Sequence, residues 1–321
     1  MVIALLGAVT ALLLPSLQAA RESSRRAACA GNLKRLGAAL LAHHDAQGAL
    51  PRNRQPVGPG RWQATSATVR LLPFFEEAAL HQRFVTAAGP PGDWDATYRL
   101  MQSSPLRVLR CASAPAAMSM AWSGAGGNYA WCTGSSLDTN WGGERFNGMI
   151  AYDRERRLAD VADGLSNTIL AGEILAGTGA TGSKGVFPFD VFYAGGAVFR
   201  QVSNRSAPSE ADLEAIGRAA VERPQGVRGN NGGLWAWYAA GHSSFTTAAP
   251  PNWIYPSAGG DCCPGGAHDW ADGVIPPRSM HPGGVHVLMG DAAVRWIADA
   301  VAPRTFQQLG NRHDGGEARS D

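Results

Sequence analysis

The chain has 321 residues, of which 45% are hydrophobic and 17% are charged, and it contains 40 Gly and 20 Pro. This composition allows a sizeable core in one large domain or two ordinary ones, and it favours loops and β structure over long helices. The formal net charge of +2 excludes the strongly basic surface that marks nucleic-acid-binding proteins, so we expect no nucleic-acid partner.

The N-terminal residues 1–20 read MVIALLGAVTALLLPSLQAA and contain no charged side chain. Their length is about that of one bilayer crossing by a helix. A signal peptide would begin with a basic region, which is missing here, and a buried helix would be unusually uniform. We therefore predict that residues 1–20 are the transmembrane half of a helix that bends or loosens at Pro15.

Residues 21–48 are polar at first and then amphipathic. Apolar side chains recur at spacings of four, three and four residues, which is the stripe of a helix with one buried face: Cys29, Leu33, Leu36 and Leu40. Gly48 and Pro51 predict the end of the helix. This outer half, residues 21–48, should therefore pack on an α+β globular domain formed by residues 49–321.

The body of the chain contains shorter patterns. Residues 67–84 are predicted to be helical, whereas Leu106–Pro115 and Ile169–Ile174 read as strands. Gly177–Gly185 resembles a phosphate-binding loop, but Gly185 follows Lys184 where that loop needs Ser or Thr. We therefore interpret this segment as a plain glycine loop.

Near the C-terminus, residues 279–297 read SMHPGGVHVLMGDAAVRWI and predict a β-hairpin. Val285–Met289 and Val294–Ile297 alternate with the period of strands, and Asp291-Ala292 lies between them. Gly suits the positive φ of a tight hairpin turn, and Ala has a steric cost there. We therefore expect a longer or different turn around Ala292.

Two histidines and a carboxylate in this hairpin raise the question of a metal site. His281 and His286 have a spacing that is not standard for zinc, and a third convergent ligand would still be needed beside Asp291. Cys262, Cys263 and His268 could contribute only if folding brought them close. We predict that His281 and Asp291 instead hydrogen-bond the loop backbone and fix the turn.

Catalytic arrangements are also missing from the sequence. Ser243 lacks the Gly-x-Ser-x-Gly elbow of a hydrolase, and Asp163 beside Ser166 reads as a turn residue. We therefore predict no catalytic residue, no cofactor and no enzyme activity. One alternative stays open, because oxygen ligands near a Gly-rich loop could suit calcium: Asp261, Asp269 and Asp272.

Five cysteines occur, at positions 29, 111, 132, 262 and 263, and no two of them form a Cys-x-x-Cys pair. This spacing argues against a zinc ribbon or a redox dithiol. Widely spaced cysteines in an exported chain fit disulfides better. The odd number leaves at least one cysteine without a disulfide partner.

The N-terminal region resembles bacterial prepilin-type proteins, in particular a large paralogous group related to the major pseudopilin of type II secretion. That group reads Leu-Leu-Pro-x-x-Gln-x-Ala-Arg-Glu-x-x-Arg-Arg and then Cys-x-x-Asn-Leu-Lys. The matching residues here are Leu13, Leu14, Pro15, Gln18, Ala20, Arg21, Glu22, Arg25, Arg26, Cys29, Asn32, Leu33 and Lys34.

Further segments resemble the same family of unknown function, domain of unknown function 1559, which carries a C-terminal His-x9-Asp-Gly motif. ADGLSNTILAGE looks like the family's Asp-Gly-x-Ser-Asn-Thr segment, and the closing hairpin matches the motif except that Ala292 replaces its Gly. The matching residues are Asp163, Gly164, Ser166, Asn167, Thr168, His281, Pro282, Gly283, Gly284 and Asp291.

The resemblance departs from the family at its start. The processing segment Gly-Phe-Thr-Leu-Val-Glu should precede residues 1–20, but the sequence begins inside the hydrophobic stretch. We expect that the native chain starts upstream of Met1; otherwise this copy is not processed or assembled in the usual way.

The resemblance implies an α+β fold, with a long pilin-like membrane helix packed on an antiparallel sheet with long loops. It also implies a single-pass protein of the inner membrane, with an extracytoplasmic domain and homo- or hetero-assembly through the helix, without catalysis. The positive-inside rule alone would place Arg21, Arg25 and Arg26 in the cytoplasm. The alternative function is a membrane-tethered binding module that exposes the Trp-rich residues 232–245 to a glycan or protein.

Family members often carry cysteines at the positions of Cys29 and Cys111, so the resemblance suggests a disulfide between them. Two buried free thiols are the alternative. Cys132 could pair with Cys262 or Cys263, and the sequence does not choose between them.

Overall fold

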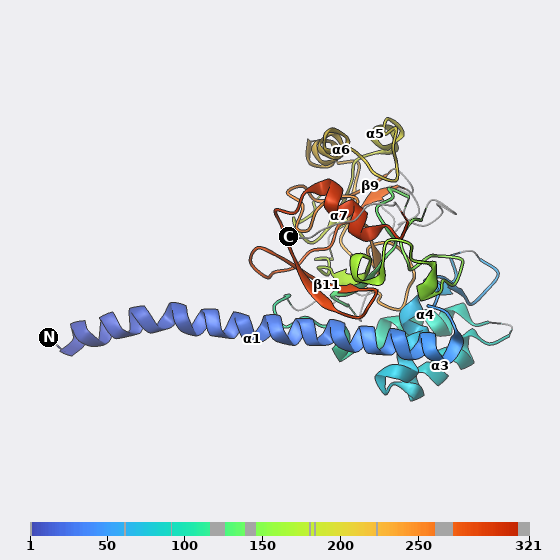
Figure 1. Cartoon of the computed structure of the whole chain (residues 1–321), viewed down its shortest axis with the longest axis horizontal. Coiled ribbons are helices and arrows are strands. Elements are labelled where there is room, and N and C mark those ends of the chain that lie inside the picture. The colour runs from blue at the N-terminus through green and yellow to red at the C-terminus, as the bar shows by residue number, and fades with distance from the viewer. Residues whose placement is uncertain are drawn as a thin grey trace.

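We describe the protein from a computed structural model. It describes residues 2–60, 62–90, 92–115, 126–138, 146–179, 181–182, 184–222, 224–260 and 272–313, without the side chains of residues 2–13 and 181–182. One long helix projects from an α+β body, as Figure 1 shows.

Helix α1, Val2–Gln47, is assigned as one continuous helix that runs through Pro15. It ends where predicted, because Gly48 adopts a φ of +77° and its N–H donates to the carbonyl of His44 at 2.7 Å. A glycine in this left-handed conformation is a common helix terminator.

The outer half of α1 buries the predicted stripe. Its apolar side chains are at most 1% exposed: Cys29, Leu33, Leu36 and Leu40. Gly37 lies on the same side, and a Cβ there would come within 2.8 Å of Leu288 Cδ1. The helix can therefore approach the sheet closely at this point.

Before Glu22 the helix leaves the body, and residues 14–21 are all exposed. Among helices whose side chains the structure describes, none is long and apolar enough to cross a membrane. Residues 1–13, most of the predicted transmembrane half, lie outside those described side chains.

A group of short helices follows α1. They are α2 (Ala67–Leu71), the 3-10 helix η1 (Leu72–Phe75), α3 (Ala78–Ala88) and α4 (Trp94–Ser103). The helical prediction for residues 67–84 is confirmed.

The strand predicted for Leu106–Pro115 is wrong. Residues 107–109 form the 3-10 helix η2 (Arg107–Leu109), with turn hydrogen bonds such as Leu109 N to Leu106 O at 3.1 Å. Leu106 and Leu109 are both buried. Apolar residues three apart therefore suit a helical turn as well as an alternating strand.

The first sheet lies between α1 and the C-terminal helix α7 (Pro303–Gly310). Its strand order is β12-β11-β4-β3-β8, antiparallel except for the parallel pair β3–β8. The strands are β3 (Tyr129–Cys132), β4 (Ile169–Glu173), β8 (Ser244–Phe245), β11 (Gly284–Met289) and β12 (Val294–Ala298). The predicted strand at 169–174 and the predicted hairpin are confirmed.

A second five-stranded sheet, with order β10-β9-β6-β7-β5, lies on the side of α5 (Gly196–Arg200) and α6 (Glu210–Glu222). Its strands are β5 (Thr181–Gly182), β6 (Val191–Tyr193), β7 (Val227–Arg228), β9 (Ser257–Gly259) and β10 (Gly273–Val274), with β6 and β9 parallel. A short hairpin joins β1 (Gln55–Pro56) and β2 (Ala64–Thr65), and two further 3-10 helices are η4 (Leu158–Asp160) and η5 (Leu165–Asn167).

The prediction of one antiparallel sheet therefore needs correction, because both sheets are mixed. Strands of two or three residues are too short to show an alternating pattern.

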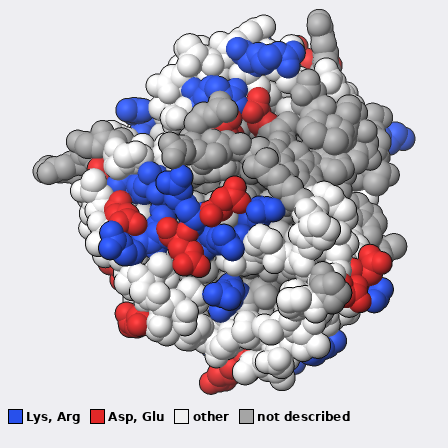
Figure 2. All heavy atoms as spheres, turned by 90° about the vertical axis from the view of Figure 1, so that its right-hand side faces the viewer, with Lys and Arg blue, Asp and Glu red and all other residues white. Residues whose placement is uncertain are grey.

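On the face of the molecule that Figure 2 shows, acidic and basic side chains are interspersed among the described residues, with no separation of the two signs.

The Trp-rich segment 232–245 does not expose its aromatic side chains, so that prediction is wrong. Trp235 and Trp237 are only 1% and 8% exposed. Their indole N–H groups donate to backbone carbonyls, Trp235 to Ser104 at 2.6 Å and Trp237 to Trp62 at 3.2 Å. With these polar groups satisfied, the rings can be buried without an unpaired donor.

Candidate functional site at the helix–sheet junction

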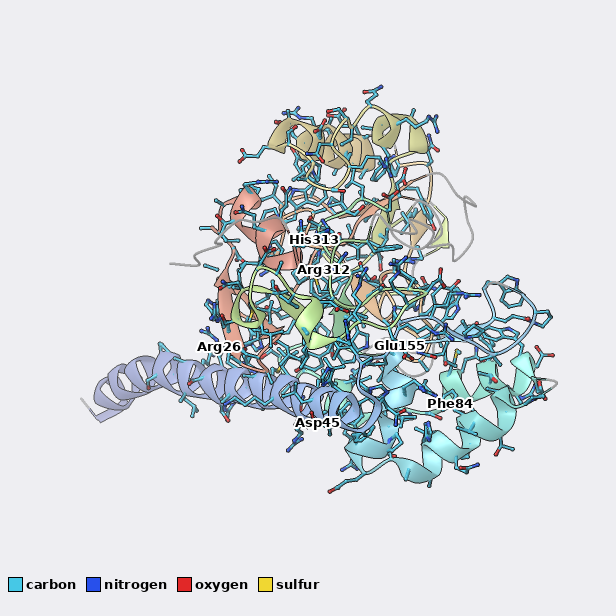
Figure 3. All side chains as sticks on the ribbon, turned by 45° about the vertical axis from the view of Figure 1, so that its right-hand side comes forward. Arg26, Asp45, Phe84, Glu155, Arg312 and His313 are labelled. Atoms are coloured by element: carbon cyan, nitrogen blue, oxygen red, sulfur yellow. A yellow bond between two sulfur atoms is a disulfide. The ribbon has the colours of Figure 1, made fainter. Side chains whose placement is uncertain are left out.

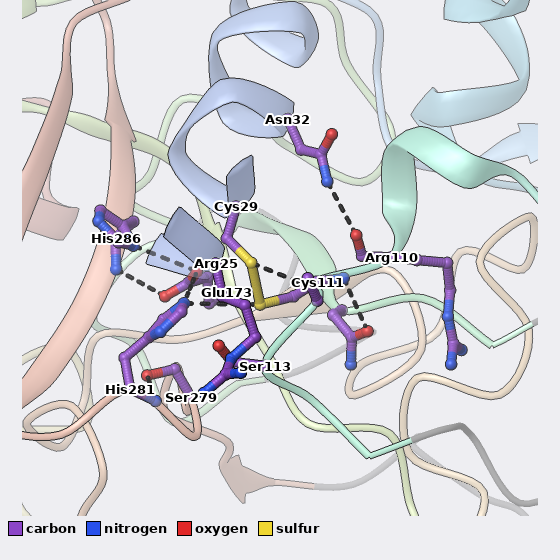
Figure 4. Close-up of a disulfide and its surroundings, with 12 residues drawn as sticks. Arg25, Cys29, Asn32, Arg110, Cys111, Ser113, Glu173, Ser279, His281 and His286 are labelled. Carbon is purple, nitrogen blue, oxygen red and sulfur yellow. Dashed lines mark hydrogen bonds and ion pairs between the residues drawn. A yellow bond between two sulfur atoms is a disulfide. The ribbon is translucent and has the colours of Figure 1, made fainter. Parts of the chain in front are cut away.

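Four titratable side chains from distant parts of the chain meet where α1 leaves the body. Arg26, which Figure 3 labels, lies on α1 four residues after the first of them. We call them the junction cluster: Glu22, Glu173, His281 and His286. Glu22 comes from α1, Glu173 ends β4, and the two histidines precede and lie within β11. Figure 4 shows this region around the two histidines.

The loop before β11 positions His281. The hydroxyl of Ser279 accepts from the His281 N–H at 3.1 Å and donates to the Gly284 carbonyl at 2.7 Å. Gly283 has a φ of +87°, and a Cβ on Gly284 would come within 2.3 Å of the Ile297 carbonyl oxygen. The two glycines therefore let this loop turn and let β11 lie close to β12, while Pro282 is exposed.

His281 bridges two carboxylates. Its Nδ1 lies 2.6 Å from Glu22 Oε1, its Nε2 lies 3.3 Å from Glu173 Oε1, and its side chain is fully buried. The prediction that the His281 side chain hydrogen-bonds loop backbone is wrong. The corresponding prediction for Asp291 is confirmed, because its Oδ1 accepts from the Ala293 N–H at 2.9 Å at the other end of the hairpin.

The carboxylates determine the charge of this histidine. Burial opposes the charged form of His281, but hydrogen bonds to Glu173 and Glu22 outweigh it and raise the pKa of His281. Burial would likewise favour a neutral Glu173, but hydrogen bonds from His281 and His286 lower the pKa of this carboxyl. The cluster therefore holds an imidazolium between two carboxylates.

His286 joins the hairpin to the same carboxylate. Its backbone N–H donates to Glu173 Oε2 at 2.7 Å, and its Nδ1 lies 3.3 Å from Glu173 Oε1. The His286 ring packs edge-on to Trp296, with ring centroids 4.9 Å apart, and the Arg26 guanidinium lies 3.8 Å from the Trp296 ring centroid. This stack connects α1 to both strands of the hairpin.

Residues at the rim hold Glu22. Arg25 Nη2 lies 2.7 Å from Glu22 Oε2, and the Ser113 hydroxyl donates to the same carboxylate at 3.1 Å. As with Glu173, burial opposes ionisation of Glu22, but hydrogen bonds from His281 and Arg25 lower its pKa. The family-motif residue Glu22 thus has a defined role in joining the helix to the body.

The disulfide between Cys29 and Cys111 is confirmed, with Cα atoms 5.1 Å apart. It joins α1 to the segment after η2, next to the junction cluster (Figure 4). The Asn32 amide donates to the Arg110 carbonyl at 2.8 Å, and the Tyr129 hydroxyl donates to the Cys29 carbonyl at 3.1 Å. These bonds fix the helix at Cys29 and at Asn32, three residues further along α1.

The same place brings together four possible metal ligands, which we call the ligand quartet: Cys29, Cys111, Glu173 and His281. One ligand atom from each lies within 4.8 Å of all the others, and all four residues are buried. Sequence reasoning missed this set because its members are far apart in the chain. One signal in the sequence could have indicated a polar site here: Glu173 is an acidic residue at the end of an otherwise apolar strand.

Other family-motif residues serve the neighbouring turn. Gly164 adopts a φ of +89°, and its carbonyl accepts from the Thr168 hydroxyl at 3.2 Å, while the Asn167 amide donates to the Asp163 carbonyl at 3.2 Å. The Thr168 carbonyl accepts from the Gly290 N–H at 2.8 Å, so this turn supports the tip of the hairpin. Three more motif residues, Pro15, Arg21 and Lys34, are exposed on α1, and Ser166 lies half-buried inside η5.

The residues considered for calcium are only partly described. Asp272 forms an ion pair with Arg205, which also pairs with Asp138 at 3.0 Å. Asp261 and Asp269 lie outside the described residues, as do Cys262, Cys263 and His268. Cys132 is a buried thiol, and burial raises its pKa to about 12.

Comparison with known families adds one finding. A family described as "Protein of unknown function (DUF1559)" matches residues 18–304. The chain belongs to this family. The match spans the whole junction cluster and the disulfide, and its description names no activity. No curated protein and no solved structure matches the chain.

Proposed function

We propose that this member of the DUF1559 family is a membrane-anchored, pseudopilin-like structural protein. It assembles, or displays its domain, through helix α1 and performs no catalysis. The observation that carries the proposal is the division of α1 into a packed half and a projecting half (Figure 1). Leu33 in the packed half is fully buried, whereas Leu14 and Leu17 in the projecting half are 56% and 50% exposed.

An uncovered apolar helix surface is unfavourable in water. Each Å² of apolar surface left exposed forgoes about 25 cal/mol of hydrophobic stabilisation. The sequence becomes more apolar towards the N-terminus, since residues 2–13 contain no polar side chain other than Thr10. Lipid or the apolar helices of other subunits would cover such a surface.

The packed half provides the rigid connection that an anchored domain needs. The Cys29–Cys111 disulfide and the Glu22–His281 contact join α1 to separate parts of the body. Disulfides persist in oxidising compartments, which supports an extracytoplasmic domain on a single-pass protein of the inner membrane.

Photo-crosslinking in native membranes tests this proposal. A photoreactive amino acid at Leu17 should form adducts with lipid or with the helix of a neighbouring subunit. Val221 in α6, which is 54% exposed, is the matched control and should form neither. Lipid adducts alone would support display, and subunit adducts would support assembly.

A fractionation experiment gives the second arm. The full-length chain should remain in membranes after alkaline carbonate extraction. The double substitution Leu14→Asp and Leu17→Asp should release part of it, because charged side chains are costly in a bilayer. A full-length chain found in the soluble fraction, with equal crosslinking from positions 17 and 221, would contradict the proposal.

A further inference from the structure

We propose that the ligand quartet binds one Zn²⁺ ion when the Cys29–Cys111 disulfide is reduced, so that zinc and the disulfide exclude each other. The inference goes beyond the anchoring function and does not depend on it. It rests on the geometry, the chemistry and the burial of the four side chains.

The distances match two edges of a tetrahedron. Zinc bonds of about 2.0–2.1 Å to nitrogen or oxygen and about 2.3 Å to sulfur give edges of about 3.3 Å between nitrogen and oxygen and about 3.5 Å between nitrogen and sulfur. His281 Nε2 lies 3.3 Å from Glu173 Oε1 and 3.5 Å from Cys111 Sγ. Two edges of the tetrahedron are therefore already near the expected length, and the remaining ligand-atom separations are all within 4.8 Å.

The distance between the two sulfur atoms explains why zinc can bind only after the disulfide is reduced. Around zinc they would be about 3.8 Å apart at tetrahedral angles, which a covalent bond between them forbids. Reduction would let the Cys29 and Cys111 side chains separate by rotation about their Cα–Cβ bonds. Helix α1 would stay in place through the hydrogen bonds from Tyr129 to the Cys29 carbonyl and from Asn32 to the Arg110 carbonyl, neither of which involves the sulfur atoms.

The donor types favour zinc over harder cations. Two thiolates, one imidazole and one carboxylate form a four-coordinate set of the kind found in zinc sites, whereas calcium and magnesium prefer oxygen ligands. The quartet is buried, so the protein would fill all four positions and leave none open. Such a closed site stabilises structure and does not activate a water molecule.

Outer contacts also fit a metal site. Zinc-binding histidines usually donate their other ring N–H to a carboxylate, which fixes the ring and its tautomer. His281 Nδ1 lies 2.6 Å from Glu22 Oε1, which leaves Nε2 directed at the other three ligands. The Ala112 N–H donates to Cys29 Sγ at 3.2 Å, and such a bond would stabilise a thiolate.

The exchange is chemically balanced with a dithiol reductant. Its thiolate attacks one sulfur of the disulfide, and its second thiol then releases the mixed disulfide. The reductant becomes a disulfide, and Cys29 and Cys111 gain two electrons and two protons as thiols. Zinc then replaces the two thiol protons and the Nε2 proton of the charged His281, and all three protons pass to solvent. Two Zn–S bonds, one Zn–N bond to His281 and one Zn–O bond to Glu173 form.

Metal binding to the full-length chain in detergent tests the inference. Cys262→Ser and Cys263→Ser are introduced in every sample, so that only the described cysteines can bind metal. After reduction with a phosphine, we expect one zinc per chain by elemental analysis. With cobalt in place of zinc, we expect the visible and sulfur-to-metal absorption of a tetrahedral cobalt–thiolate site. The oxidised chain should bind neither metal.

Variants locate the site. His281→Ala should weaken zinc binding by more than the roughly 10–100-fold that loss of an outer contact costs, and Glu22→Gln should weaken it by about 10–100-fold. Cys132→Ser is the matched control, because it removes a buried thiol outside the quartet and should leave the stoichiometry at one. Near-ultraviolet circular dichroism of each oxidised variant verifies folding.

Three outcomes would overturn the inference. They are a reduced chain that binds no metal, an oxidised chain that binds it equally well, and unchanged affinity in His281→Ala. If a variant does not fold, the measurement that decides is zinc-dependent protection of Cys29 and Cys111 from alkylation in the reduced chain that carries only the Cys262→Ser and Cys263→Ser substitutions. Carbonate extraction of the membranes from which each variant is prepared reports the anchor separately, so a failed zinc site and a failed anchor are distinguishable.

Discussion

Among the described residues, two buried clusters that each contain histidine hold their histidines in opposite charge states. In the junction cluster, the carboxylates of Glu22 and Glu173 hold His281 charged. The second cluster, which we call the inner cluster, lies beside the Trp-rich segment and consists of Arg228, Asn230, Asn231 and His242. Burial, and then the nearby charge of Arg228, holds the pKa of His242 well below its usual value.

The hydrogen bonds of the inner cluster define the tautomer of His242. Its Nδ1 accepts from the Leu234 N–H at 3.1 Å, so the proton of the neutral ring is on Nε2. Asn230 Nδ2 lies 3.0 Å from Nε2. Because Nε2 carries the proton, we assign the Asn230 amide in the reversed orientation, in which its oxygen accepts that proton. A neutral histidine thus has a hydrogen-bond partner at both ring nitrogens.

The difference follows from how each cluster is assembled. The inner cluster comes from residues 228–242, one continuous segment enclosed by aromatic side chains such as Trp237, whose ring lies 5.0 Å from that of His242. The junction cluster joins three separate segments at a partly exposed rim. His281 is therefore charged because acidic side chains from two distant segments meet there, and its contacts with them couple α1 to the sheet.

Removing the disulfide should have the largest effect and would test what holds the junction together. Cys29→Ser with Cys111→Ser should lower the free energy of unfolding by about 4–5 kcal/mol in the chain-entropy model, because the bridge spans a sequence separation of 82. Urea unfolding of oxidised, metal-free protein in detergent measures this. Reduction of the unsubstituted protein should give a similar loss, and a loss confined to only one of the two samples would contradict the entropic explanation.

Removing the Trp237 ring should expose His242 to water and make its charge state more like that of His281 in the junction cluster. Trp237→Ala should lower the free energy of unfolding by about 3 kcal/mol, near the lower end for such truncations since the ring is not fully buried. Water would then reach His242 and raise its pKa towards the usual value. Thermal unfolding and histidine NMR titration measure the two effects, and an unchanged pKa would show that Arg228, not burial, dominates.

Neutralising Glu22 should loosen the junction. Glu22→Gln removes the charge that faces His281 and Arg25, and we expect a loss of about 1–2 kcal/mol, reduced by the partial exposure of the carboxylate. Glu214→Gln is the matched control, because Glu214 and Arg218 form an exposed ion pair on α6 and should show no measurable change. Equal changes in the free energy of unfolding would mean that the contacts of Glu22 stabilise the protein no more than an exposed ion pair does.

The inner cluster should make stability fall at mildly acidic pH. The folded pKa of His242 is lowered, so below about pH 6.5 the unfolded chain binds a proton that the folded chain does not. The contribution of neutral His242 to stability is therefore fully present above about pH 6.5. As the pH falls below that value, the free energy of unfolding declines by up to about 1.4 kcal/mol per pH unit until the pKa of His242 in the folded protein is reached.

Because carboxylates also titrate in this range, the comparison with His242→Gln is the measurement. The slope of unfolding free energy against pH, between pH 6.5 and 5.5, should be shallower in the variant. Identical slopes would show that His242 takes up its proton in the folded state as well.

Sequence reasoning succeeded for features encoded by neighbouring residues. The stripe from Cys29 to Leu40, the strand at Ile169 and the C-terminal hairpin all follow from local period. The disulfide followed from resemblance alone. Glu173 and His281 could not be paired in this way, because their proximity depends on β4 and β11 being neighbours in the sheet. The Trp-rich segment was misjudged for the same reason, since distant carbonyls satisfy its indoles.

The smallest effect is expected at the tip of the hairpin, where Ala292 replaces the family's Gly. The sequence predicted a longer or different turn at this position. The turn consists of Gly290, Asp291 and Ala292, and it is closed by a hydrogen bond from the Met289 N–H to the Ala293 carbonyl at 2.8 Å. Ala292 keeps a left-handed φ of +64°, which costs an L-residue about 1 kcal/mol.

Ala292→Gly should relieve that strain but lose a methyl group that packs beside α1, where a Cβ on Gly37 would lie 3.2 Å from it. The two effects oppose each other, and we expect a net gain below about 1 kcal/mol. Ala293→Gly is the matched control, because Ala293 is exposed and has no positive φ, so it should only lose stability. If Ala292→Gly is destabilising in urea unfolding, the contact between the hairpin tip and α1 outweighs the backbone strain, and the junction extends along the whole hairpin.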